Sequence, residues 1–290
     1  MAWPIGGGGM PELPEVEAVV NALGGIVRGK RITGVRVLRP QTIQSMSVTR
    51  FCRLLRGRVI ERVRRRAKFI LLDLSDGWTL VVHLRMTGGF VYAESRRPFP
   101  PTARVLFLLE GGARLAYTDI RNLGLIRLVR TERLDRWAEW RRLGVEPLSR
   151  TFTVRRLEEM LRGSRRAIKA FLLDQTKVVG LGNIYAAEAL HRARLSPMRR
   201  AESVARSRAR VVALYESIRE TLREAIAAQS TGPLHLEFVN AQGQSHHPRR
   251  APSPFRVYGR EGEPCPVCGA PIRRIKQHGR STYYCARCQT

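Results

Sequence analysis

The stretch Pro11-Glu12-Leu13-Pro14-Glu15-Val16-Glu17 carries the strongest structural and chemical signals in this sequence. Proline suits the first turn of a helix, and acidic side chains suit its positive N-terminal end. Apolar residues then recur at the helical spacing i, i+3, i+4 and i+7, at Val16, Val19, Val20 and Leu23. The pattern predicts a helix over Pro14–Leu23, and we expect Gly24-Gly25 to end it.

The chemical value of Pro11 depends on its place in the chain. A proline nitrogen is a nucleophilic amine only in the first residue, because inside a chain it is an amide without an N–H group. Glu12 places a carboxylate directly after it. Whether residues 1–9 are present in the working protein therefore decides whether this pair can act as a catalytic centre.

Residues 1–9 have no apolar period and end in four glycines. They are too short and too uncharged for a signal peptide. One interpretation is an unstructured leader. The other is a misassigned start, because purine-rich glycine codons upstream of ATG resemble a ribosome-binding site. Met10 would then be the true first residue, and its removal would expose Pro11. We expect residues 1–9 to be non-native or disordered.

Composition favours a nucleic-acid partner. The 290 residues allow one large or two modest domains, and no apolar run approaches the roughly 18 residues of a membrane span. We therefore expect a cytoplasmic protein that does not bind membranes, and we also expect it to be a monomer. The 52 Lys and Arg against 24 Asp and Glu give a net charge of +28, which is typical of proteins that bind polyanions. Codon bias explains the excess of Arg over Lys, but it does not explain why acids are so few.

Several short strands with turn punctuation predict a β-sandwich or barrel-like N-terminal domain. The expected strands are Ile32–Val37, Val59–Arg64, Phe69–Leu74, Thr79–Leu84, Val105–Leu109, Leu115–Thr118 and Leu125–Val129. After Trp140 the apolar period changes to 3.6. The expected helices are Val154–Leu161, Ala167–Leu173, Ile184–Ala193 and Val204–Ala228. Gln242–Pro254 is rich in breakers and charge, so we expect a loop there.

Four of the five cysteines form the pattern Cys265-x2-Cys268-x16-Cys285-x2-Cys288. Four thiolates in two close pairs satisfy tetrahedral Zn²⁺ with no open position, which predicts one structural zinc. Between the pairs, Ile272–Tyr284 has the pattern of a β-hairpin with a basic tip. Arg280 on this hairpin is a candidate for a DNA groove or, alternatively, part of a solvated turn.

A second motif is Asp174-Gln175-x4-Gly180-Leu181-Gly182-Asn183-Ile184-Tyr185. Glycines before a helix let the backbone approach a ligand closely, and free N–H groups at the helix start favour a phosphate. Asn183 can add an amide donor, and Lys169, one helix earlier, is placed to reach the same phosphate. The alternative is a tight helix–helix turn that uses glycine for packing alone.

Four further side chains are candidates for DNA contacts. Lys68 follows Arg64-Arg65-Arg66 at a strand start, where four basic residues in five favour a phosphate-facing surface over the alternative of a solvated charge. Met86 and the Arg121/Leu123 pair follow strand ends, where they could fill the gap left by an extracted base. Core packing is the alternative for Met86 and Leu123, and from these residues alone it is the favoured one.

Together these motifs resemble those of the formamidopyrimidine-DNA glycosylase family, also called bacterial 8-oxoguanine DNA glycosylases. The matching pieces occur in family order and cover nearly all of residues 10–289. They are Pro11–Glu17, Arg65–Lys68, His83–Gly88, Leu172–Glu188, Val257–Cys265 and Gly279–Thr282.

The resemblance implies a fold and a division of the chain. The fold is α+β and multidomain, with an N-terminal β-sandwich led by a helix, a helix-two-turn-helix domain and a four-cysteine zinc finger. On this sequence the catalytic sandwich would occupy residues 10–140 and the DNA-binding helical domain residues 141–235. A base-capping loop or linker over residues 236–256 and the finger over residues 257–290 would follow.

The resemblance also implies a bifunctional enzyme of base-excision repair that acts on damaged double-stranded DNA. Its N-terminal proline, here Pro11, attacks C1′ and expels an oxidised purine, and Glu12 is the acid/base acting at the sugar ring oxygen. β- and δ-elimination from the Schiff base then nick the strand. Lys68 and Arg280 belong to this catalytic set, and together with Lys169 and Asn183 they match the family's phosphate contacts. Met86, Arg121 and Leu123 fall at its void-filling positions.

Two departures from the family pattern affect substrate choice. The family's Asp-Pro-Arg-Arg-Phe-Gly run here reads Asp119-Ile120-Arg121-Asn122-Leu123-Gly124, so leucine replaces an aromatic wedge that could stack. The family's base-capping segment is also altered over residues 231–254. A non-catalytic damage-binding protein is the alternative if residues 1–9 are retained, and a glycosylase for oxidised pyrimidines is a second alternative.

Overall fold

The computed structural model describes residues 10–290 except 45, 95–97, 230–234, 243 and 247–254. The residues expected to form a leader, 1–9, and most of the loop expected over Gln242–Pro254 therefore lie outside the described residues. The chain divides into two compact units. The first combines residues 1–141 with 228–250, and the second combines residues 142–227 with 251–290.

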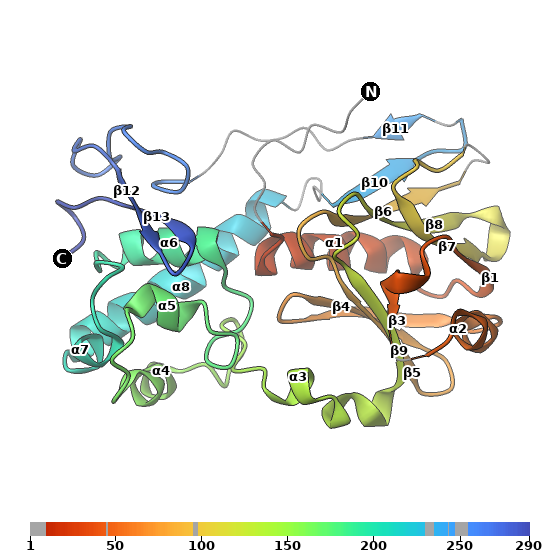
Figure 1. The fold of residues 1–290 in the computed structure, drawn as a ribbon, viewed down its shortest axis with the longest axis horizontal. Helices are drawn as coiled ribbons and strands as arrows, with labels where there is room; N and C mark the ends of the chain where they lie inside the picture. The colour runs from red at the N-terminus through yellow and green to blue at the C-terminus, as the bar shows by residue number, and fades with distance from the viewer. Residues whose placement is uncertain (1–9, 45, 95–97, 230–234, 243, 247–254) are drawn as a thin grey trace. The chain divides into compact units, whose positions relative to one another are not determined.

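The described residues of the first unit form two β-sheets with helices, which confirms the expected sandwich led by a helix (Figure 1). One sheet has the order β1-β7-β8-β6-β10-β11 and the other has the order β2-β9-β5-β4-β3. The six-stranded sheet consists of β1 (Ile32–Val37), β6 (Gly88–Ala93), β7 (Ala103–Leu109), β8 (Arg114–Asp119), β10 (Leu236–Val239) and β11 (Ser245–His246). The five-stranded sheet consists of β2 (Ile43–Gln44), β3 (Ile60–Arg66), β4 (Phe69–Leu74), β5 (Trp78–His83) and β9 (Leu125–Arg130).

One apolar core joins the two sheets and their helices. Helix α1 (Leu13–Val27) packs on β3 and β4, and helix α2 (Val48–Leu55) packs on β1. Fully buried side chains such as Val16, Phe51 and Ile70 belong to the same cluster as Phe107 of the opposite sheet. Burial of this apolar surface is the main stabilising contribution to the unit.

The second unit contains helices and a hairpin. Its helices are α4 (Val154–Leu161), α5 (Ile168–Leu172), α6 (Asn183–Arg192), α7 (Ala201–Ala205) and most of α8 (Arg208–Gln229), and its hairpin consists of β12 (Arg273–Gln277) and β13 (Arg280–Tyr284). A short helix α3 (Ala138–Arg141) ends the first unit's main segment, and 3-10 turns lie at Pro40–Thr42, Glu110–Gly112 and Thr131–Arg136.

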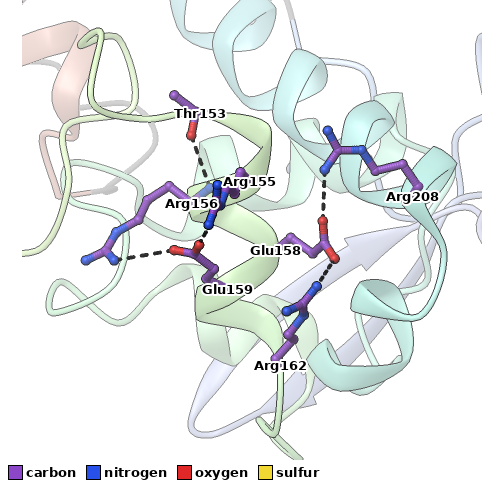
Figure 2. Close-up of polar contacts among 7 residues, drawn as sticks. All are labelled: Thr153, Arg155, Arg156, Glu158, Glu159, Arg162 and Arg208. Atoms are coloured by element: carbon purple, nitrogen blue, oxygen red, sulfur yellow. Dashed lines mark hydrogen bonds and ion pairs between the residues drawn. The ribbon is translucent and has the colours of Figure 1, made fainter.

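An ion-pair network holds α4 against α8 within the second unit, as Figure 2 shows. Glu158 accepts hydrogen bonds from Arg162 at 2.5 Å and from Arg208 at 2.8 Å. The hydrogen bond from Arg162 and then that from Arg208 hold the pKa of Glu158 below its usual value. Thr153 caps α4 by accepting the Arg156 N–H at 3.1 Å. Some arginines of this surface, such as Arg162 and Arg208, therefore pair with protein carboxylates.

Three expectations about local structure were wrong. Helix α1 continues through Gly24-Gly25 to Val27, because Val27 is fully buried and its packing outweighs the low helix propensity of glycine. The single helix expected over Val204–Ala228 is interrupted between α7 and α8 at Arg206-Ser207. Strands β6 and β10 were not predicted, and β10 pairs in parallel with β6 inside the segment expected to be a linker.

No helix among the described residues is long and apolar enough to cross a membrane.

Two glycine substitutions test this packing. An added Cβ at Gly25 meets nothing within 4 Å, so Gly25→Ala should stabilise α1 by about 0.5–1 kcal/mol. An added Cβ at Gly144 would lie 2.2 Å from the Lys177 carbonyl oxygen, so Gly144→Ala should destabilise the second unit by about 1–3 kcal/mol. Urea denaturation of both variants measures the two shifts, and equal shifts would contradict the packing described here.

Candidate active site and nucleic-acid interface

The start of α1 is held by a carboxylate with two partners. Glu15 Oε2 accepts the Glu12 N–H at 2.9 Å, and Glu15 Oε1 accepts the Gln229 side-chain amide at 2.7 Å. Glu12 is 2% exposed, and Pro11 before it is buried. Glu17, one turn on, forms an ion pair with Arg65. The backbone and side chains around Pro11 and Glu12 are thus fixed by the surrounding fold.

Gln229 and His235 lie beside this helix start but were not found from the sequence. The His235 carbonyl accepts the Phe90 N–H at 2.8 Å, and its ring Nδ1 lies 3.1 Å from the Gly88 carbonyl oxygen. Burial lowers the pKa of His235, and the negative charge of Glu15 partly opposes that shift. No sequence signal identifies such residues, because the Gln229–Glu15 contact spans 214 positions.

Lys68 lies at the turn between β3 and β4, where Ala67 has a positive φ of 53°. The side chain is 8% exposed. Two of the preceding arginines are engaged inside the unit, since Arg64 pairs with Asp73 at 2.6 Å and Arg65 pairs with Glu17. The basic residues from Arg64 to Lys68 therefore do not form one solvated surface, since two of them pair with protein carboxylates. Lys68 remains the candidate DNA contact of this segment.

The charge of Lys68 acts on the neighbouring His83. Burial first, then Arg85 and Lys68, lower the pKa of His83 to about 3. His83 Nδ1 accepts the Arg85 N–H at 3.0 Å, which positions the turn that leads to Met86. A neutral imidazole is the form that can accept this bond at neutral pH.

Two turns carry the candidate wedge residues. Met86 is half-buried between β5 and β6, while Arg121 and Leu123 are exposed between β8 and β9. Leu123 is 47% exposed, so the core-packing interpretation was wrong for this residue. An apolar side chain held in water at a turn is available for contact with another molecule.

In the second unit, the glycine motif forms a tight loop before α6. Gln175 closes the loop by accepting the Gly180 N–H at 2.9 Å and donating to the Leu181 carbonyl at 2.8 Å. Gly182 is the N-cap residue, and the helix begins at Asn183. This arrangement places the positive end of the α6 dipole beside Asn183, and a helix start of this kind favours a phosphate.

Lys169 joins this loop to the C-terminal hairpin. Its ammonium donates to Asn183 Oδ1 at 2.7 Å, to Thr282 Oγ1 at 2.6 Å and to the Ser281 carbonyl at 3.1 Å. Asn183 also donates to the Ser281 carbonyl, at 2.9 Å. Lys169 is only 2% exposed, so in this structure it ties the loop to the residues that follow Arg280.

Arg280 stands at the tip of the β12–β13 hairpin. His278 and Gly279 have φ values of 48° and 77°, which gives the two-residue turn that suits a tight hairpin. Arg280 is exposed. The predicted basic hairpin is therefore present, and its tip presents a guanidinium to solvent.

The four C-terminal cysteines form a zinc site. Their sulfur atoms all lie within 4.8 Å of one another, with Cys265 and Cys288 at 3.9 Å and Cys268 and Cys285 at 3.5 Å. Tetrahedral Zn–S bonds of about 2.3 Å require S···S distances of roughly 3.8 Å, so the donor set fits one Zn²⁺.

Neighbouring groups orient the zinc site and attach the finger to α6. His191 Nε2 lies 3.4 Å from Cys265 Sγ. Glu188 accepts the N–H groups of Arg256, Val257 and Tyr258 at 2.8, 3.0 and 2.8 Å. Burial nevertheless raises the pKa of Glu188. The contact between Glu188 and these N–H groups was not predicted from the sequence, because a glutamate inside a helix gives no signal for a partner about 70 residues away.

Three family models match successive parts of the chain. They are the formamidopyrimidine-DNA glycosylase N-terminal domain at residues 10–126, the H2TH domain of the same enzymes at residues 143–234, and a zinc finger found in FPG and IleRS at residues 262–290. The chain belongs to the formamidopyrimidine-DNA glycosylase family. The resemblance seen in the sequence, the expected fold class and the expected zinc are confirmed.

Individual relatives agree with this assignment. The formamidopyrimidine-DNA glycosylase of Pelotomaculum thermopropionicum is 44% identical over 97% of this chain and 99% of its own length. That of Desulforamulus reducens is 40% identical with the same coverage. A Lactococcus lactis Fpg solved with DNA containing an abasic site is 30% identical, with a TM-score of 0.86 over 96% of this chain and 99% of the other. The same enzyme solved with DNA containing an oxidised pyrimidine also gives a TM-score of 0.86.

Removal of the zinc should release the hairpin before the sandwich unfolds. The site holds the base of the hairpin, whereas the first unit has its own apolar core. A chelator should therefore abolish DNA binding while the far-UV signal of the sandwich persists, and metal analysis of purified protein should give one zinc per chain. Reduced cysteines without bound zinc would contradict the assignment.

Proposed function

We propose that this chain is a DNA glycosylase with AP lyase activity that removes oxidised purines in base-excision repair. Membership of the family supports the enzyme class. The assignment of Pro11 and Glu12 as catalytic residues is supported by the fixed position of this pair at the start of α1. Its partner is damaged double-stranded DNA, and the net charge of +28 suits that partner. A protein that repairs chromosomal DNA would be located in the cytoplasm, at the nucleoid, and we propose that it acts there as a monomer.

The proposed reaction begins at the free amine of Pro11. Its lone pair forms a bond to C1′ of the damaged nucleoside, and the base leaves with the electrons of the glycosidic bond and takes up the proton that the proline nitrogen loses. Glu12 then transfers a proton to the ring oxygen, the bond between C1′ and that oxygen breaks, and the nitrogen lone pair completes a cationic Schiff base to the opened sugar. The positive end of α1 lies beside Glu12, where it stabilises the carboxylate that remains after the proton has been transferred.

The Schiff base makes the adjacent sugar protons acidic. Loss of one proton expels the 3′ phosphate by β-elimination, and a second elimination expels the 5′ phosphate. In the 290-residue chain Pro11 follows Met10 in an amide bond, so this reaction requires a chain that begins at Pro11. The N-terminal family match begins at residue 10, which supports a start at Met10 followed by its removal.

DNA binding divides among several groups in this proposal. Lys68, Lys169, Asn183 and Arg280 contact phosphates, and Met86, Arg121 and Leu123 fill the space left by the extruded base. Exposure of Arg280 and the loop-and-helix start at Asn183 support the phosphate assignments. Lys169 would have to exchange one of its protein partners for a phosphate oxygen, since it is 2% exposed in this structure.

We propose the following domains: catalysis at residues 10–140, DNA binding at 141–235, base capping or linkage at 236–256, where β10 also adds a strand to the sheet of the first unit, and the finger at 257–290. The boundary between the compact units at residue 141 supports the first division. Oxidised pyrimidines form a second candidate substrate class, because one structural neighbour was solved with DNA that contains one. Competition between duplexes carrying 8-oxoguanine and an oxidised pyrimidine decides between the classes.

The salt dependence of binding tests the phosphate contact of Arg280. The logarithm of affinity should fall linearly with the logarithm of salt concentration, and Arg280→Ala should flatten the slope by about one unit. Arg155 is a matched control, because its side chain is 87% exposed on α4 and pairs with Glu159. An equal change of slope in Arg155→Ala would remove the assignment of a specific contact to Arg280.

A change at Glu12 separates the two chemical stages. In a protein that begins at Pro11, Glu12→Gln should lose base excision far more than borohydride trapping on a preformed abasic site, because its proposed proton transfer serves excision. Single-turnover rates on 8-oxoguanine duplex and abasic duplex measure the split. Equal losses on the two substrates would show that Glu12 does not have the proposed role.

A further inference from the structure

The two turns that carry the wedge candidates lie side by side at one end of the sandwich. Strand β6 pairs with β8 so that Gly88 is opposite Asp119, and β5 pairs with β9 so that His83 is opposite Leu125. One turn, over residues 83–88, connects β5 to β6, and the other, over residues 119–125, connects β8 to β9. Both turns therefore cross from one sheet to the other, and they begin and end at residues that are paired with each other.

One buried carboxylate joins these turns. The Asp119 side chain is 1% exposed and accepts the Thr87 hydroxyl at 2.5 Å, the Arg121 N–H at 3.1 Å and the Gly124 N–H at 2.7 Å. The Thr87 hydroxyl oxygen in turn accepts the Arg121 N–H at 3.0 Å. Hydrogen bonds to a buried carboxylate are strong, so Thr87, next to Met86, is tied to both ends of the Arg121–Leu123 turn.

Two glycines allow this close approach. An added Cβ at Gly88 would lie 2.6 Å from the Tyr117 hydroxyl and 2.4 Å from the Leu84 carbonyl oxygen. At Gly124 it would lie 1.7 Å from the same hydroxyl. The fully buried Tyr117 thus fills the space beneath both turns, and its hydroxyl pKa is raised by burial and by the charge of Asp119.

Two apolar side chains are exposed at the tip of this assembly. Ile120 is 44% exposed and Leu123 is 47% exposed, although the buried Asp119 holds the backbone N–H groups of the neighbouring Arg121 and Gly124. A rigid turn that presents apolar side chains suits insertion between base pairs, because unstacking a base step requires a side chain that stays in place.

We propose that Asp119 and Thr87 are positioning residues that join the Met86 turn and the Arg121–Leu123 turn into one preformed wedge. Neither residue needs to touch DNA. The Thr87–Asp119 bond makes Met86 and Leu123 enter the duplex together, so that displacement of a base does not wait for the two turns to become ordered. This inference rests on the proposed function, since it specifies how that site opens a duplex.

The test uses a duplex with 2-aminopurine opposite a tetrahydrofuran abasic analogue, so the signal does not require catalysis. In the protein that begins at Pro11, binding should raise 2-aminopurine fluorescence. Thr87→Val should slow that rise about tenfold, the effect expected from loss of one hydrogen bond to a charged group. Thr87→Ser keeps the hydroxyl and should restore the rate, whereas Asp119→Asn should slow it at least as much as Thr87→Val.

Thr33→Val is the matched control, because it removes a threonine hydroxyl bond to the Leu108 carbonyl elsewhere in the same sheet. Affinity for undamaged duplex and the circular dichroism of the Thr87 variants should stay unchanged. A wild-type rate in Thr87→Val, or equal losses in Thr87→Val and Thr87→Ser, would overturn the inference, as would a wild-type protein that gives no fluorescence rise. A wild-type protein that gives the rise but excises no base would instead contradict the proposed function.

Discussion

The double hydrogen bond of Glu15 is the interaction on which the proposed catalytic centre depends. One carboxylate oxygen holds the N–H of Glu12, and the other holds the amide of Gln229. The first bond is local and would form in any helix with this start. The second bond reaches a residue 214 positions later, so the orientation of Pro11 and Glu12 is set only when the whole first unit has folded.

Elsewhere in the structure, too, residues that belong to a local motif are positioned by other residues that are buried. Arg280 is presented by a zinc-bound hairpin, and the hairpin is tied to the loop before α6 by Lys169 and Asn183. Leu123 is presented by a turn that Asp119 holds from beneath. In each case an exposed candidate contact rests on a buried polar group with several partners, which is costly to disrupt.

Local patterns determined how much could be predicted from the sequence. Phe69–Leu74 was predicted to the residue, because apolar strand residues are bounded by clear turn signals. Strand β6 was missed because it begins with Gly88-Gly89 and is buried on both faces, so no alternation marks it. The zinc site was predictable because its spacing is set by the metal. Gln229, His235 and Glu188 were not, because their partners lie far away in the sequence.

The claim on which this account depends most is that the amine of Pro11 is the nucleophile. The most direct test is an intact-mass measurement of the protein translated from its own start signals, combined with borohydride trapping on abasic DNA. The account predicts a chain that begins at Pro11 and is trapped through that residue, while a chain extended before Pro11 binds DNA without being trapped. A chain verified to start at Met1 that nicks abasic DNA as fast as the Pro11 form would contradict it.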